Sequence, residues 1–128
     1  MAINYKLVAK INPLNRNLAA KYYVKAIINK SVSLKELARG LAARSTTASE
    51  GDVYSVLIGM RDLMKEHLER SDKVTIDGIG SFQMSLSSEG AETEEKFNHS
   101  LIKKAKVLYK EDSEMKSFTR NQKFTKVK

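Results

Sequence analysis

The 128-residue sequence contains no cysteine and no tryptophan, and it has a single proline, Pro13. Without cysteine the chain has no disulfide framework and no thiolate metal site, which suits a reducing cytoplasm. No uninterrupted apolar run approaches the ~20 residues that a membrane-spanning helix needs. The first ten residues also lack the apolar region of a secretory signal. We therefore expect a cytoplasmic protein with no membrane partner.

Motifs for catalysis and metal binding are also lacking. His67 and His99 have no second ligand at metal spacing, and the adjacent Glu94 and Glu95 have no context that marks a catalytic pair. No G-x-x-x-x-G-K-[ST] phosphate-binding loop occurs. We predict that the protein is not an enzyme, needs no cofactor or metal, and has no small-molecule substrate.

Acidic residues are few at both ends of the chain. The net charge is +8, and it divides into +8 over residues 1–48, −6 over residues 49–102 and +6 over residues 103–128. A surface field of one sign attracts polyanions through release of their counterions. Charge alone leaves two interpretations open: a nucleic-acid partner, or lysines that only confer solubility.

The first thirty residues favour strands. Residues 5–11 and 21–28 are rich in β-branched and aromatic side chains, and Pro13 lies between them among asparagines that suit a turn. Residues 17–27 are also compatible with the beginning of a helix. We expect residues 1–32 to form a basic, strand-like N-terminal extension.

Two helices are predicted next. Ser33 and Glu36 match a capping box, which indicates a helix over about 34–44. A polar cluster at 44–47 interrupts the pattern, and Ser49 is a suitable cap for a second helix over about 50–70. Its apolar residues recur at helical spacing, so we expect a helical hairpin with a core-facing stripe. The stripe consists of Val53, Val56, Leu57, Met60, Leu63, Met64 and Leu68.

The remaining sequence alternates with period two, as strands do. Strands are predicted over about 73–77 and 80–87, with Gly78 and Gly80 at a tight turn between them. The acidic, apolar-poor segment over about 87–101 is expected to protrude as an arm. A strand then returns over about 101–110, with Lys104 and Lys106 on one face and Lys103 on the other. Ser113 is the predicted cap of a short helix over about 113–120, and residues 121–128 form a basic strand or tail.

This order of elements resembles the HU/IHF family of bacterial histone-like DNA-binding proteins. The stretch Gly78-Ile79-Gly80-Ser81-Phe82 is similar to the family's G-F-G-x-F turn at the base of its DNA-binding arm, where Phe82 would pack under the helices. The chain looks closer still to a longer HU-related group of Bacteroidetes-type bacteria. It shares that group's NPLN-like, LSSEGAET-like and KFTKV-like stretches, at residues 12–15, 86–93 and 123–127.

The resemblance implies an α+β fold of HU/IHF type. Its HU-like domain would cover residues 33–120, with a helical hairpin packed on a small antiparallel sheet and a protruding β-arm. Strand extensions would flank it at both ends, and two chains would form an intertwined dimer. One departure concerns the arm, whose tip in HU carries a proline that wedges between base pairs. Here the tip has no proline and is acidic; Phe97, Leu101 and Ile102 are left as either wedge or packing residues.

The function implied by the resemblance is non-enzymatic binding of double-stranded DNA by a homodimer. Binding would have low sequence specificity, use backbone and minor-groove contacts, and serve DNA condensation and the architecture of the bacterial nucleoid. The predicted DNA contacts are Lys103, Lys104, Lys106, Lys110, Arg120 and Lys123. For any single lysine the alternative is a solvated edge that discourages strand aggregation. The alternative function is a protein-interaction or structural module that uses the HU fold without bending DNA; RNA binding ranks below both.

Overall fold

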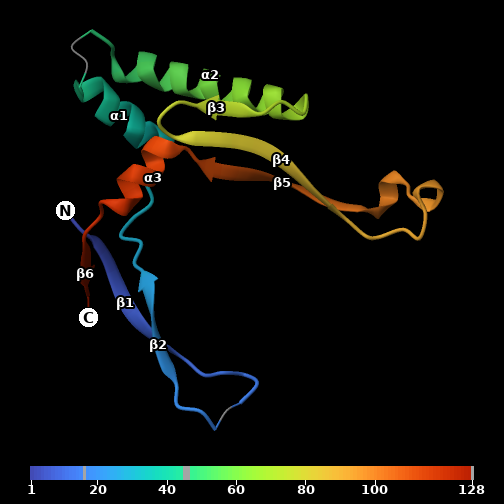
Figure 1. Ribbon diagram of the computed structural model, residues 1–128. Helices are drawn as coiled ribbons and strands as arrows, with labels where there is room; N and C mark the ends of the chain where they lie inside the picture. Colours follow the sequence, from blue (N-terminus) through green and yellow to red (C-terminus); the bar gives the residue numbers. More distant parts are fainter. Residues whose placement is uncertain (16, 45–46, 128) are drawn as a thin grey trace. The chain divides into compact units, whose positions relative to one another are not determined.

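The computed structural model describes residues 1–15, 17–44 and 47–127, and it divides into two compact units (Figure 1). One unit, here called the terminal unit, combines Met1–Ser33 with Phe118–Lys128. The other, the central unit, is Leu34–Ser117. The terminal unit is thus built from both ends of the chain, and the central unit is one continuous segment between them.

The terminal unit is a three-stranded sheet of order β2-β1-β6. Strand β1 (Ile3–Lys10) pairs antiparallel with β2 (Lys21–Ala26) and parallel with β6 (Phe124–Lys126). The sequence of residues 21–26 is compatible with either a strand or a helix, and in the structure these residues form strand β2. Asn12 lies in the connection between β1 and β2, where its side-chain oxygen accepts a hydrogen bond from the Leu14 amide at 2.9 Å.

The central unit begins with a helical hairpin of α1 (Leu34–Arg44) and α2 (Glu50–Glu69). The Ser49 hydroxyl accepts a hydrogen bond from the Asp52 amide at 3.1 Å, so Ser49 is the N-cap of α2. Of the polar break predicted at 44–47, Ser45 and Thr46 lie outside the described residues.

A second sheet follows the hairpin, with strands in the order β3-β4-β5. Strand β3 (Val74–Ile76) is short, whereas β4 (Gly80–Ser88) and β5 (Ile102–Glu111) pair with each other along their whole length. The part of β4 and β5 beyond β3 extends from the body of the central unit as a two-stranded arm (Figure 1). At the end of the arm the backbone forms two short 3₁₀ turns, Glu94–Lys96 and His99–Leu101.

Helix α3 (Ser113–Arg120) follows β5 and carries the chain back to the terminal unit. The predicted cap at Ser113 is wrong by one residue, because Ser113 is already helical. Asp112 caps the helix instead, and its Oδ1 atom accepts a hydrogen bond from the Met115 amide at 2.8 Å. A carboxylate suits this position because it satisfies a free amide and interacts favourably with the helix dipole.

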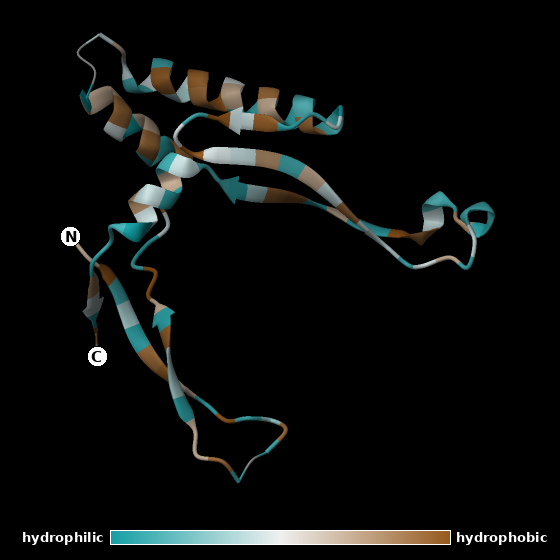
Figure 2. Cartoon of the chain, in the orientation of Figure 1, coloured by the Kyte–Doolittle hydropathy of each residue, from teal (hydrophilic) through white to brown (hydrophobic). Residues whose placement is uncertain are grey.

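Very little of the apolar surface is enclosed within one copy of the chain. Among the described residues, Ala38 is the only fully buried apolar side chain. Helix α2 carries several hydrophobic bands along its length (Figure 2). By exposure, the residues of its apolar stripe divide into two rows. One row is half-buried: Val53, Leu57, Met64 and Leu68. The other row is exposed by 70%, 46% and 54% at Val56, Met60 and Leu63.

Candidate nucleic-acid interface

The base of the arm is a glycine turn between β3 and β4. Gly78 has φ +84°, a left-handed conformation that favours glycine. Gly80 has φ +152°, and a Cβ atom added to it would lie 2.1 Å from the Lys110 carbonyl oxygen. Strands β4 and β5 therefore approach each other here more closely than any larger residue allows.

Two side chains, one near the C-terminal end of β5 and one just after it, hydrogen-bond to the backbone of this turn. The Tyr109 hydroxyl donates a hydrogen bond to the Ile79 carbonyl at 2.7 Å. The Asp112 Oδ2 atom accepts a hydrogen bond from the Gly78 amide at 2.6 Å. The Tyr109 ring also lies against Phe82, with the ring centroids 5.1 Å apart. Desolvation raises the pKa of Tyr109, and the negative charges of Glu111 and Asp112 raise it further.

Sequence reasoning missed both supporting residues. Asp112 carried a usable signal, since an acidic residue directly before Ser113 and Glu114 is a common way to begin a helix. Tyr109 carried none, because its partner lies 30 positions away in the sequence. Such a pair becomes visible only once the strands are in register.

The arm presents a face on which lysines of β5 lie opposite serines of β4. The register pairs Ser81 with Lys110, Ser85 with Lys106, and Ser87 with Lys104. These three lysines are exposed and lie on one face, with Leu108 between Lys106 and Lys110. Four of these residues, Ser85, Ser87, Lys104 and Lys106, line a shallow hollow together with Leu86. We call the three paired serines and three lysines the lysine–serine face: Ser81, Ser85, Ser87, Lys104, Lys106 and Lys110.

The lysine–serine face has the chemistry and the length to follow a phosphate backbone. Ammonium and hydroxyl groups are both common donors to phosphate oxygens. From Lys104 to Lys110 the strand advances by roughly 20 Å at ~3.3 Å per residue. That length corresponds to about six base pairs of duplex at ~3.4 Å per step. Several phosphates therefore lie within its reach.

The other predicted contact residues lie elsewhere. Lys103 has no cross-strand partner, because the register shifts between Ser87, which pairs with Lys104, and Ser88, which pairs with Ile102. Arg120 and Lys123 belong to the terminal unit, where the Lys123 carbonyl accepts a hydrogen bond from the Ile3 amide at 2.8 Å. Of the six residues expected as one contact surface, three thus lie on the lysine–serine face, Lys103 lies at the register irregularity, and two belong to the terminal unit.

The tip of the arm is acidic and locally ordered by its own side chains. Lys96 forms an ion pair with Glu92 at 3.1 Å, and Thr93 and Asn98 cap the two 3₁₀ turns. The carboxylates of Glu89, Glu94 and Glu95 are on exposed residues. Of the candidate wedge residues, Phe97 is 42% and Ile102 38% exposed, while Leu101 is half-buried.

Other candidate chemistry is limited. His67 has a partner that the sequence did not predict, since its Nδ1 atom lies 2.9 Å from the Asp72 carboxylate. Within residues 1–15, 17–44 and 47–127, no three His, Cys, Asp or Glu side chains are placed to hold a metal ion. The helices of the same residues include none that is long and apolar enough to cross a membrane.

A helical hairpin, a small antiparallel sheet and a long two-stranded arm define an HU-like α+β fold. Two solved structures share it. Anabaena HU in a cocrystal with DNA has a TM-score of 0.52 and 16% identity, covering 70% of this chain and 98% of that one. A candidate bacterial DNA-binding protein from Bacteroides vulgatus has a TM-score of 0.70 and 9% identity, covering 98% of this chain. This chain spans about half of the Bacteroides protein, 48% of its length.

The family follows from the sequence match. The HU-HIG model, described as an HU domain fused to a wHTH, Ig or glycine-rich motif, matches residues 1–126. The chain therefore belongs to the HU-HIG family, and the HU resemblance read from the sequence is confirmed. No curated protein matches the chain.

Proposed function

We propose that this protein is a non-enzymatic, HU-type DNA-binding protein that contacts the phosphate backbone of duplex DNA with the lysine–serine face of its arm. The observation that carries the proposal is the cross-strand register, which sets Lys104, Lys106 and Lys110 on one exposed face beside serine hydroxyls. The shared fold with Anabaena HU, a protein crystallised with DNA, supports the same partner.

The composition of this face favours low sequence specificity. Lysine and serine contact phosphate oxygens readily, and the planar side chains of arginine, asparagine and glutamine are the ones best shaped for bidentate contacts to a base edge. Gln83 is the only such side chain on the face formed by residues 81–87 and 104–110. A contact surface of this kind suits a role in nucleoid architecture and DNA condensation.

A homodimer is the assembly that the apolar surface of α2 supports best. Val56, Met60 and Leu63 recur at spacings of four and three, so they form one helical row that a single chain leaves exposed. A contiguous exposed apolar row of this kind marks an interaction site. The exposed Leu37 and Leu41 of α1, 51% and 44% accessible, add to the surface that a second copy would cover.

The alternative function is a protein-interaction module that keeps the HU fold without bending DNA. The acidic tip favours this alternative, because Glu89, Glu94 and Glu95 repel phosphates. The arm also has no proline that could insert between base pairs. The lysine–serine face and the net charge of +8 favour DNA.

Binding to DNA of different shapes decides between the two functions. Affinity for linear duplex, nicked duplex and a four-way junction is measured across a series of salt concentrations. A DNA-binding protein shows affinity that falls steeply with salt, and changing Lys103, Lys104 and Lys106 to alanine weakens it while leaving folding intact. A parent protein without salt-dependent binding to any of these DNAs would establish the interaction module instead.

Neutralising the tip tests where the arm points. Replacing Glu92, Glu94 and Glu95 by glutamine should strengthen DNA binding if the tip approaches phosphates. Unchanged affinity would mean that the tip points away from the duplex. Glutamine keeps the length and polarity of the side chains, so the comparison isolates charge.

A further inference from the structure

The sheet of the terminal unit has two chemically different faces. The register of β1 with β2 and β6 places alternate residues on opposite sides. One face is almost entirely apolar and forms a hollow lined by Ile3, Tyr5, Val24, Ala26 and Phe124. The other face carries the lysines of both long strands. We call this second set the basic face: Lys6, Lys10, Lys21 and Lys25, with Tyr23 at its centre.

The lysines of the basic face lie directly opposite one another. Lys6 pairs with Lys25 and Lys10 pairs with Lys21 across the antiparallel strands, and all four are exposed. Like charges in directly opposed cross-strand positions destabilise a sheet. Two such pairs, separated by about 13 Å along β1 at ~3.3 Å per residue, concentrate four positive charges on one small surface.

The terminal unit contains no acidic side chain to offset these charges. Its two segments carry ten Lys or Arg residues and no Asp or Glu, whereas the central unit carries thirteen Lys or Arg and fifteen Asp or Glu. The terminal unit is therefore +10 and the central unit −2, so the positive charge of the protein resides in the smaller unit. Neutralising counterions for this face must come from outside it.

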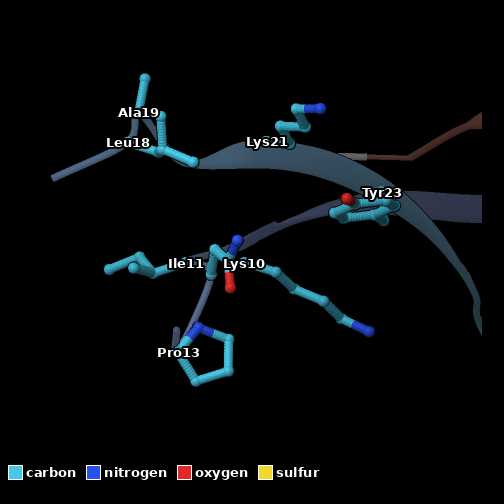
Figure 3. Close-up of a pocket in the computed structure, with 8 residues that line it drawn as sticks. Lys10, Ile11, Pro13, Leu18, Ala19, Lys21 and Tyr23 are labelled. Carbon is cyan, nitrogen blue, oxygen red and sulfur yellow. The ribbon is translucent and has the colours of Figure 1, made fainter. Parts of the chain in front are cut away.

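An aromatic side chain lies between the two lysine pairs. Tyr23 is 48% exposed, and the Lys10 ammonium lies 5.6 Å from the centroid of its ring. Lys10, Lys21 and Tyr23 also contribute to the wall of a hollow of about 400 Å³ at the end of the hairpin (Figure 3). A tyrosine hydroxyl is a frequent donor to phosphate oxygens, so Tyr23 adds a neutral donor to the four ammonium groups.

We propose that the basic face of the terminal unit is a second DNA-binding surface, which contacts the phosphate backbone of duplex DNA separately from the arm. The inference rests on the proposed function in one respect, that the polyanion is DNA. Duplex DNA carries one negative charge per ≈ 1.7 Å of its axis, a density that offsets the repulsion within both lysine pairs at once. A second surface on the same chain raises affinity by turning later contacts into intramolecular ones.

The test compares three variants of the full chain by fluorescence anisotropy on a linear duplex, from about 50 to 200 mM salt. The sheet variant is Lys6→Gln, Lys10→Gln, Lys21→Gln and Lys25→Gln. The arm variant is Lys104→Gln, Lys106→Gln and Lys110→Gln. The control variant, with the same net charge as the sheet variant, is Lys30→Gln, Lys35→Gln, Lys65→Gln and Lys73→Gln, all at exposed positions.

The sheet variant is expected to reduce the slope of log affinity against log salt by about 0.9 for each lost phosphate contact. The reduction would reach about 3.6 if all four lysines contact phosphates. The control variant should change the slope much less. Thermal unfolding provides a second measurement. Because the sheet variant removes two opposed lysine pairs, its melting temperature should equal or exceed that of the parent, so weaker binding cannot be attributed to unfolding.

Each other outcome has a definite meaning. A sheet variant with the parent's slope, beside an arm variant that loses slope, overturns the basic face and leaves the arm interface standing. A control that loses as much as the sheet variant also overturns it, since net charge then explains the effect. A parent without salt-dependent binding overturns both surfaces.

Smaller changes keep the test decisive if the quadruple variant fails to fold. The pairs Lys6→Gln with Lys25→Gln and Lys10→Gln with Lys21→Gln should each produce about half of the slope change, near 1.8. Replacing the same four lysines by arginine should preserve the slope, because charge is retained. Loss of slope in the arginine variant would contradict a phosphate-binding role.

Discussion

The carboxylate of Asp112 links the glycine turn at the base of the arm to the first turn of α3. One oxygen accepts a hydrogen bond from the Gly78 amide at 2.6 Å, and the other accepts one from the Met115 amide at 2.8 Å. Gly78 and Asp112 are 34 positions apart in the sequence, so this pair joins two elements that no local interaction would bring together. We therefore expect the glycine turn at the base of the arm and the first turn of α3 to stabilise each other.

Replacing Asp112 by alanine removes both acceptors. The free energy of unfolding should fall by about 1–2 kcal/mol for the lost cap, with a further loss from the unpaired Gly78 amide. Urea unfolding followed by circular dichroism measures the change. Ser113→Ala is the matched control, because Ser113 lies inside the helix and is not its cap. Equal effects of the two substitutions would contradict the assignment of Asp112.

Replacing Gly80 by valine should destabilise the protein strongly. The added Cβ would lie 2.1 Å from the Lys110 carbonyl oxygen, and φ +152° is unfavourable for a β-branched residue, so strain of at least ~1–3 kcal/mol is expected. The control is Gly90→Ala, where an added Cβ meets nothing within 4 Å. Differential scanning calorimetry should show a lower melting temperature for the first variant and a nearly unchanged one for the second.

The stability contributed by Tyr109 should be lost at alkaline pH. An unfolded tyrosine ionises near pH 10.0, and the pKa of folded Tyr109 is raised by desolvation and then by Glu111 and Asp112. A raised folded pKa means that this contribution is complete below pH 10.0 and declines as pH rises through the folded pKa. Tyr109→Phe keeps the ring but loses the hydrogen bond to Ile79, so it should be less stable near neutral pH and decline less above pH 10.0. Parallel pH profiles of the two proteins in urea unfolding would refute this role.

The lysines of β5 should contribute unequally to DNA binding. Lys104→Ala with Lys106→Ala removes two charges from the lysine–serine face and should lower the salt slope by about 2 units. Lys103→Ala removes a charge at the register irregularity, outside the lysine–serine face, and should change the slope less per residue. Anisotropy titrations at several salt concentrations measure both. A slope change as large per lysine for Lys103 as for the pair would contradict a special role of the lysine–serine face.

An acidic residue in the exposed row of α2 should disrupt the dimer. In Met60→Glu a charge replaces an apolar side chain that is 46% exposed in one copy and would be desolvated in the interface. Sedimentation velocity at micromolar concentration should show a shift from dimer to monomer. Lys65→Glu, at an exposed position outside the row, is the control. A monomeric parent protein, or a dimer unaffected by the change, would argue against this interface.

Local patterns in the sequence predicted the helices and the arm strands closely. Ser49 and the apolar repeat from Val53 to Leu68 indicated α2, because capping and amphipathic spacing act within one or two turns. The alternation after Gly80 likewise indicated β4, since side chains of a strand alternate whatever its partner is. These signals depend on neighbours a few residues away, so the sequence alone carries them.

Long-range pairing decided the rest. Strand β6 pairs in parallel with β1, although nearly the whole chain separates the two strands in the sequence. This pairing places Lys123 and Arg120 in the terminal unit instead of the arm. The opposition of Lys6 to Lys25 exists only because the strands adopt one register, and a slip by one residue would put those lysines on opposite faces. The sequence determined which segments are basic and which are strands. Only the tertiary structure determined which lysines share a face, because register is set by contacts between residues distant in the chain.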